Sequence, residues 1–302
     1  MLQICNHSCC TVGLYSGQNQ QGQHQLTCVI KAGFSFTSDG QLKILQDSVA
    51  IEETDRFAGE VHQSYLLASS EIVPFKPQIE ILLYGSAQVP SNNSVVTEVS
   101  LGIHWPNNAV WQKCLRVFGP RDWQRTLIGW LPSKPQLLAD PLPISYQYAY
   151  GGTGYKLNPI GQGFKQTVLP QIELGPKFIS KKADQPIPAG FAPIPSYWNI
   201  NQDTQMHNIY SAAPADQQFE QPFIGGEDIF LKGLIKNASQ ISLVLPAIKP
   251  RLILQLAQQT QQLTIKCDTV VINTDEQVLY MIWRTGVPWD RNDQRQGFLK
   301  IS

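Results

Sequence analysis

The stretch TVVINTDEQVLYMIW, residues 269–283, decides the fold class of this chain. Two apolar runs, 269–272 and 278–283, flank a segment of turn-forming residues, which is the pattern of a β-hairpin. Outward from it, residues 95–104 and 252–256 alternate in the period of two that is typical of a half-buried strand, and 263–267 repeat it. A second hairpin is indicated where Ser38-Asp39-Gly40 separates two short apolar stretches.

No long stretch has the 3.6-residue period of a helix, and the best helical candidate is short, at residues 214–220. We therefore predict a mainly β fold. The expected architecture is two packed antiparallel sheets in a sandwich-like arrangement, with long ordered Gly/Pro-rich loops and few short helices.

The middle of the chain differs from the rest in composition. Residues 119–226 contain 25 of the 43 Gly and Pro residues, and these two residue types interrupt regular strand ladders. The same region is rich in aromatic residues, which argues against disorder. We predict a single domain over 1–302, with 119–226 as an ordered, loop-rich central region inside it.

Composition excludes several function classes. The 302 residues carry 23 Lys plus Arg and 23 Asp plus Glu, so the chain lacks the basic excess of nucleic-acid-binding proteins. No apolar run reaches the length of a membrane span, and the N-terminus lacks the pattern of a secretory signal. We expect a cytoplasmic protein that binds no nucleic acid and does not insert into a membrane.

The six cysteines are most simply reduced thiols in that compartment. Cys28 and Cys267 lie in strand-like sequence, where a buried thiol behaves as a small hydrophobic group. Cys5, His7, Cys9 and Cys10 are the best metal candidate, because four soft ligands fall within six residues. No second ligand pair follows, so inert strand residues are the favoured interpretation and we expect no metal.

Motifs for catalysis are absent from the sequence. It contains no HExxH zinc pattern, no GxSxG nucleophile elbow and no GxxxxGK[ST] phosphate loop. Its Gly-rich segments, 151–154 and 161–163, do not lie between a strand and an apolar helix and are interpreted as turns. Carboxylates that only folding brings together remain possible, and Asp216, Glu227 and Asp228 are the candidates for a hydrolytic pair.

Several short strings occur in an order that resembles the domain-of-unknown-function family 2169, found in bacteria beside type VI secretion genes. Each string is weak alone, but their shared order covers nearly the whole chain. The strings are PFKPQIE (74–80), FGPRDW (118–123), AYGG (149–152), NPIGQGF (158–164), LPQIE (169–173), PAGFAPIPSYW (188–198), APADQ (213–217), GGE (225–227), CDTVVI (267–272) and WR (283–284).

The resemblance implies a role rather than a reaction. Family members look like cytoplasmic adaptors or chaperones that stabilise a type VI effector and help to load it onto the VgrG spike or its PAAR tip. We therefore expect a non-enzymatic protein with a protein partner and no cofactor. The alternatives are a hydrolase of cell-wall or carbohydrate substrates that uses central-region carboxylates, and a structural baseplate component that binds every spike.

The chain departs from the family pattern at three places. Gln147 stands where a Glu is usual, Ala192 stands where Gly is preferred, and the segment NINQDTQMHNIYSA, 199–212, is short. That segment is a candidate for the choice of effector.

The residues that form the motif core or bind a partner are, by this resemblance, Arg121, Trp123, Asn158, Trp198, Asp216, Gln217, Glu227 and Arg284. Each also has a structural interpretation. Arg121 either faces a partner or pins a neighbouring loop's carbonyl groups, and we favour the second. The two tryptophans are more simply core residues, Asn158 a turn former, and Asp216 and Gln217 helix N-terminal residues. Glu227 is expected to close a buried polar network with Arg121 or Arg284.

Overall fold

The computed structural model describes residues 2–199, 210–256, 259–289 and 297–302. Three larger sheets and four strand pairs dominate this part of the chain, and its helices have three or four residues. The prediction of a mainly β fold of packed sheets is confirmed. Most of the segment 199–212 lies outside the described residues.

The largest sheet has seven strands, and the fold-deciding stretch lies at its centre. β22 (Lys266–Asn273) and β23 (Val278–Pro288) pair antiparallel, as the hairpin pattern predicts. The order is β17-β7-β22-β23-β3-β2, with β4 also paired to β3. The other strands are β2 (Thr11–Gln18), β3 (His24–Phe36), β4 (Leu42–Ile44), β7 (Ile79–Tyr84) and β17 (Gln218–Phe219).

The second sheet has five strands in the order β16-β10-β9-β18-β19. They are β9 (Val96–His104), β10 (Val110–Phe118), β16 (Ile172–Leu174), β18 (Asp228–Ile235) and β19 (Ala238–Val244). A third sheet has the order β1-β24-β20-β21, with β1 (Leu2–Asn6), β20 (Leu252–Leu256), β21 (Gln259–Leu263) and β24 (Gly297–Ile301). One apolar cluster contains buried residues of all three sheets.

Two pairs in these larger sheets are parallel, β7 with β22 and β1 with β24, so both sheets are mixed rather than purely antiparallel. The pattern of 263–267 is also split, because Leu263 ends β21 and Lys266 begins β22 in another sheet. Parallel partners can lie far apart in sequence, and side-chain periodicity says nothing of which strand is the neighbour.

The two faces of the seven-stranded sheet differ in chemistry, because successive side chains of a strand point to opposite sides. Ile30, Ile81, Val270 and Leu279 belong to the apolar core. The alternate positions carry polar and charged residues, among them Lys31, Glu80, Thr269, Tyr280 and Arg284, and line a cavity on the other face. The strands are thus buried on both sides, and the cavity face mixes these polar groups with Leu82, Val271 and Ile282, whereas the core face is apolar.

The apolar face also holds two of the buried thiols, Cys28 and Cys267. Burial raises the pKa of the Cys28 thiol from 9.0 to about 12 and that of Cys267 well above 9.0. Above pH 9 the unfolded chain loses these protons before the folded chain does. The stabilisation that is complete below pH 9 is therefore lost as the pH rises toward the folded pKa.

We expect this loss to be measurable by urea denaturation under reducing conditions. Between pH 9 and about pH 10.5 the Cys28 contribution falls by about 2 kcal/mol, at 1.36 kcal/mol per pH unit. The Cys28→Ala variant is expected to lose that much less stability over the same interval than the wild-type chain. Equal losses in the two proteins would show that Cys28 does not titrate differently in the folded state.

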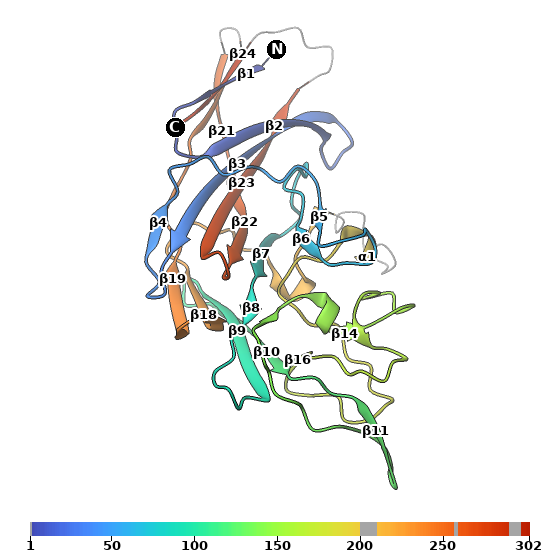
Figure 1. Ribbon diagram of the computed structural model, residues 1–302. Helices are drawn as coiled ribbons and strands as arrows, with labels where there is room; N and C mark the ends of the chain where they lie inside the picture. Colours follow the sequence, from blue (N-terminus) through green and yellow to red (C-terminus); the bar gives the residue numbers. More distant parts are fainter. Residues whose placement is uncertain (1, 200–209, 257–258, 290–296) are drawn as a thin grey trace.

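The central region is built of short elements. They are β11 (Trp123–Thr126), β12 (Gly129–Pro132), β13 (Leu142–Pro143), η1 (Tyr146–Tyr148), β14 (Tyr150–Gly151), β15 (Gln162–Gly163), β16, α1 (Ser196–Asn199), η3 (Ala215–Gln217) and β17. β13 pairs with β8 (Ser86–Ala87), and β5 (Arg56–Phe57) pairs with β6 (Leu66–Ala68). Figure 1 shows the third sheet and both chain termini at one end of the molecule and the β11–β12 hairpin at the opposite end.

Candidate functional site

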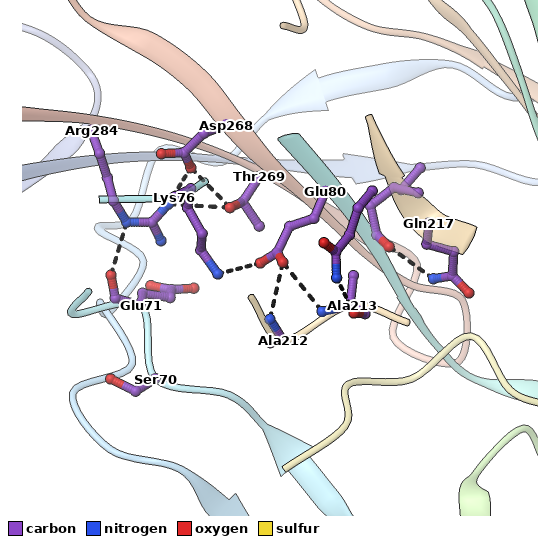
Figure 2. A network of polar contacts seen from close by, with 12 residues as sticks. Ser70, Glu71, Lys76, Glu80, Ala212, Ala213, Gln217, Asp268, Thr269 and Arg284 are labelled. Carbon is purple, nitrogen blue, oxygen red and sulfur yellow. Dashed lines mark hydrogen bonds and ion pairs between the residues drawn. The ribbon is translucent and has the colours of Figure 1, made fainter. Parts of the chain in front are cut away.

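The cavity on the polar face of the seven-stranded sheet has a volume of about 440 Å³. Strands β3, β7, β22 and β23 form its floor, and residues 65–71, which include β6, lie along its wall. At and beside the floor, three buried ion pairs join Lys31 to Glu71, Lys76 to Glu80, and Arg284 to Asp268. Figure 2 shows the last two pairs and the backbone groups around them.

The hydrogen bonds of these side chains tie distant parts of the chain to the sheet. Glu71 accepts from Lys31 Nζ at 2.7 Å and from the backbone N–H of Glu52 at 3.0 Å. Its own carbonyl accepts from Arg284 Nε at 3.1 Å. Glu80 accepts the backbone N–H groups of Ala212 and Ala213 at 3.0 and 3.2 Å, as Figure 2 shows.

These charges neutralise one another, three cations against three carboxylates. A buried pair adds little net stability but leaves an expensive uncompensated charge when one partner is removed. Burial raises the pKa of the Asp268 carboxyl above its ordinary value, and Arg284 opposes that rise. The hydrogen bonds of Glu71 and Glu80 to backbone groups fit a structural role, in which these side chains hold neighbouring loops against the sheet.

A second buried cluster surrounds Lys113 of β10. Its ammonium group donates to Gly190 O at 2.7 Å, Asp216 Oδ1 at 2.8 Å and Gln217 Oε1 at 2.9 Å. Gln217 in turn donates to Ile81 O and Phe191 O at 2.8 and 3.0 Å. Burial lowers the pKa of Lys113, and the Asp216 carboxylate opposes this.

Asp216 and Gln217 lie in the short helix η3 directly after Pro214, as expected of helix N-terminal residues. No sequence pattern indicated that Lys113, more than 100 positions away, is their partner. The role of this cluster is to join β10 of one sheet to β7 of the other through the central region.

Arg121 is buried and connects several segments of the central region. Its guanidinium donates to Pro170 O at 2.7 Å, forms a buried ion pair with Glu173, and lies 3.7 Å from the centroid of the Phe118 ring. Glu173 also accepts the backbone N–H of Ile179 at 2.7 Å. Arg121 therefore binds a carbonyl group of a neighbouring loop, which is the structural role that we favoured for it from the sequence.

Asn158 and the two tryptophans are also buried. Asn158 donates to Tyr146 O at 2.8 Å and Tyr150 O at 3.0 Å, and so fixes the turn in which it lies. Trp123 packs in a separate apolar cluster with Tyr150, Leu169 and Ile179. Trp198 packs with Tyr146 in a third cluster, with ring centroids 6.0 Å apart.

The prediction that Glu227 joins a buried polar network with Arg121 or Arg284 is wrong. It accepts the backbone N–H groups of Ile224 and Gly225 at 2.7 and 2.9 Å, while Arg121 pairs with Glu173 and Arg284 with Asp268. Gly225 has a φ of +94°, a conformation that favours glycine and turns successive N–H groups toward one acceptor. The sequence Gly-Gly-Glu is the signal for this local turn, in which the backbone of Gly225 and of the preceding Ile224 supplies the two donors.

The carboxylates considered for hydrolysis are engaged separately. Asp216 pairs with Lys113, Glu227 closes its own turn, and Asp228 accepts from Ser242. Within the described ranges, none of the three lines the 440 Å³ cavity.

The cysteine-rich start of the chain forms a turn. β1 ends at Asn6, whose side chain donates to Cys10 O at 2.7 Å, and Cys10 is buried while Cys9 is exposed. The described residues contain no group of three or more His, Cys, Asp or Glu that could hold a metal ion. No described helix is long and apolar enough to cross a bilayer.

An exposed feature that sequence reasoning missed is the tip of the β11–β12 hairpin. Leu127 and Ile128 form the two-residue loop, with relative exposures of 107% and 84%. Trp123, at the base of the hairpin, is buried, and near the loop the ammonium of Lys182 lies 4.1 Å from the centroid of the Trp130 ring. The sequence could have revealed this tip, because two large aliphatic residues stand where the loops of two-residue hairpins usually carry Gly, Asn or Asp.

Fold and site together define a mainly β scaffold in which buried ion pairs hold a loop-rich region that ends in an exposed apolar hairpin. The family model described as an uncharacterized protein conserved in bacteria, DUF2169, matches residues 21–204 and 201–284. The chain belongs to this family. No curated protein and no solved structure matches it.

The strings that carry the family resemblance supply most of the buried pairs. Lys76 and Glu80 both lie in PFKPQIE, Arg121 and Glu173 lie in FGPRDW and LPQIE, and Arg284 follows Trp283 in WR. These positions therefore hold the scaffold together.

Proposed function

We propose that the chain is a non-enzymatic cytoplasmic adaptor that binds a type VI secretion effector and assists its loading onto the VgrG spike or PAAR tip. This is the role that the family resemblance implies. The observation that supports it most directly is the central region itself, which is fastened from inside by Arg121 and Lys113 and presents apolar side chains to solvent. Preorganised apolar groups of this kind are the usual anchors of protein interfaces.

The mechanism we propose is masking. The adaptor covers apolar surface of the effector until contacts at the spike compete for the same surface. A rigid contact region suits this exchange, because little conformational entropy is lost on binding or regained on release. In this mechanism the scaffold with its buried ion pairs provides stability, and the apolar hairpin recognises the partner.

Co-expression with the effector encoded beside its gene, followed by affinity purification and light scattering, tests the proposal. We expect a complex of defined stoichiometry and an effector that is more soluble with the adaptor than alone. A spike from an unrelated effector cluster is the control, because a baseplate component would bind that spike as well. A chain that elutes alone while the effector is soluble without it would contradict the adaptor role.

A further inference from the structure

We propose that the β11–β12 hairpin is the anchor of the protein interface, and that its Leu127–Ile128 tip enters an apolar groove with an acidic rim on the partner protein. This inference rests on the proposed function, because it names the contact surface of the adaptor and the chemistry of the partner. Figure 1 shows the hairpin at the end of the molecule, away from the three larger sheets.

The tip residues have no task in the fold. Leu127 is as exposed as in an extended peptide, and Ile128 retains 84% of its accessible surface. The loop between Thr126 and Gly129 would form as well with Asn and Gly, the residues favoured in two-residue hairpin loops. Trp130 and Leu131 of β12 are also exposed and, as successive strand residues, lie on opposite faces of the hairpin. The adjacent Leu127 and Ile128 are therefore the apolar group that protrudes furthest, and apolar side chains exposed together indicate an interaction site better than scattered ones do.

The hairpin is held in one orientation before any partner binds. Trp123 anchors β11 in its own apolar cluster, and Asp122 and Ser133 exchange hydrogen bonds of 2.8 and 3.0 Å across the base. Thr126 Oγ1 donates to Gly129 O at 2.7 Å beside the loop. Lys182 over the Trp130 ring joins β12 to the segment that follows β16. A prepositioned tip avoids most of the ordering cost of binding.

The net charge of the segment that contains the hairpin indicates the partner's chemistry. Residues 119–187 contain eight Lys or Arg and four Asp or Glu, a net charge of +4 in a chain whose total is zero. Arg121 and Glu173 are buried as a pair, so seven cations face three carboxylates over the rest of this region. Electrostatic complementarity favours a partner surface rich in carboxylates and speeds the encounter.

An anionic lipid surface would also attract the basic segment and could accept apolar side chains. A tip of two aliphatic residues inserts little apolar area into a bilayer, and stable peripheral anchoring needs a larger apolar face or a lipid chain as well. A protein groove surrounds the same two side chains on several sides and removes more of their surface from water. The structure therefore favours a protein partner.

The test compares the affinity of three proteins for the purified effector by surface-immobilised binding at low and high salt. In Leu127→Asn/Ile128→Gly the tip is polar and the loop chemistry favourable, so its thermal unfolding should match that of the wild-type chain. We expect binding to weaken about 100-fold, or about 2.7 kcal/mol. The control Val244→Ser removes an exposed aliphatic side chain of β19 and should bind like wild type.

The variant Arg125→Glu provides a second readout that does not depend on the tip. It should bind more weakly at low salt and show less salt dependence than wild type. Equal affinities of the wild-type chain and the tip variant would overturn the hairpin proposal and leave the adaptor role standing. A wild-type chain that binds no effector overturns both.

Sedimentation with phosphatidylcholine vesicles that contain phosphatidylglycerol tests whether the hairpin binds an anionic membrane instead of a protein. We expect no tip-dependent sedimentation. If the wild-type chain sediments with these vesicles, and Leu127→Asn/Ile128→Gly does not, the hairpin is a membrane anchor and the protein-groove proposal is wrong.

Discussion

Replacing Arg121 by methionine is expected to lower the free energy of unfolding by about 3–5 kcal/mol. The substitution keeps the length and much of the apolar volume of the side chain but removes the cation beside Glu173. That carboxylate is 3% exposed and would be left buried without its charged partner. Urea denaturation of the purified chain at neutral pH measures the effect.

Two further variants identify the cause. Arg125→Met makes the same chemical change at an exposed position of β11 and should alter the free energy of unfolding by less than about 0.5 kcal/mol. Arg121→Met combined with Glu173→Gln removes both charges, so the double variant should be more stable than Arg121→Met alone. If the double variant is no more stable than Arg121→Met, the ion pair is not what holds this region.

Truncating Trp123 to alanine is expected to cost about 3–5 kcal/mol, as large aromatic truncations in well-packed cores do. Trp123 is buried among Tyr150, Leu169 and Ile179 in a cluster separate from the main core. The loss should therefore appear first as faster backbone hydrogen exchange in the central region, before the seven-stranded sheet opens. Trp123→Ala should also weaken effector binding, because the hairpin loses its anchor.

Trp130→Ala is the matched control for this prediction. Trp130 lies on the other strand of the same hairpin and is 41% exposed, so its truncation removes far less buried surface. We expect a stability loss of about 1 kcal/mol or less and unchanged exchange around Tyr150. Similar losses in both tryptophan variants would mean that the cluster around Trp123 does not fasten the hairpin.

The strand pattern of the chain was readable because side-chain alternation is a local property. The hairpin formed by β22 and β23, the strand β9 and the short helix at Ala215–Gln217 all lie where periodicity and turn residues placed them. The parallel pairing of β7 with β22 was not readable, because the two strands are nearly 190 positions apart. Alternation also failed to show that the second face of the sheet is buried.

The buried charged residues show the same limit. The sequence marked Arg121, Asp216 and Arg284, but their partners Glu173, Lys113 and Asp268 were not among the proposed site residues. An ion pair between distant residues depends on how the sheets pack, which a single sequence does not contain. The prediction for Glu227 was wrong in the opposite direction: distant arginines were expected, whereas its carboxylate accepts from the backbone N–H groups of Ile224 and Gly225, three and two positions before it.

Hydrogen–deuterium exchange of the chain alone and in complex with the co-purified effector is the measurement that tests the adaptor account most directly. The account predicts slower exchange in the hairpin, residues 123–132, and in the basic segment 177–187. Residues 65–71 and 269–284, which include residues that line the cavity, should exchange alike in both states. Protection confined to the cavity, or no difference anywhere, would contradict the account.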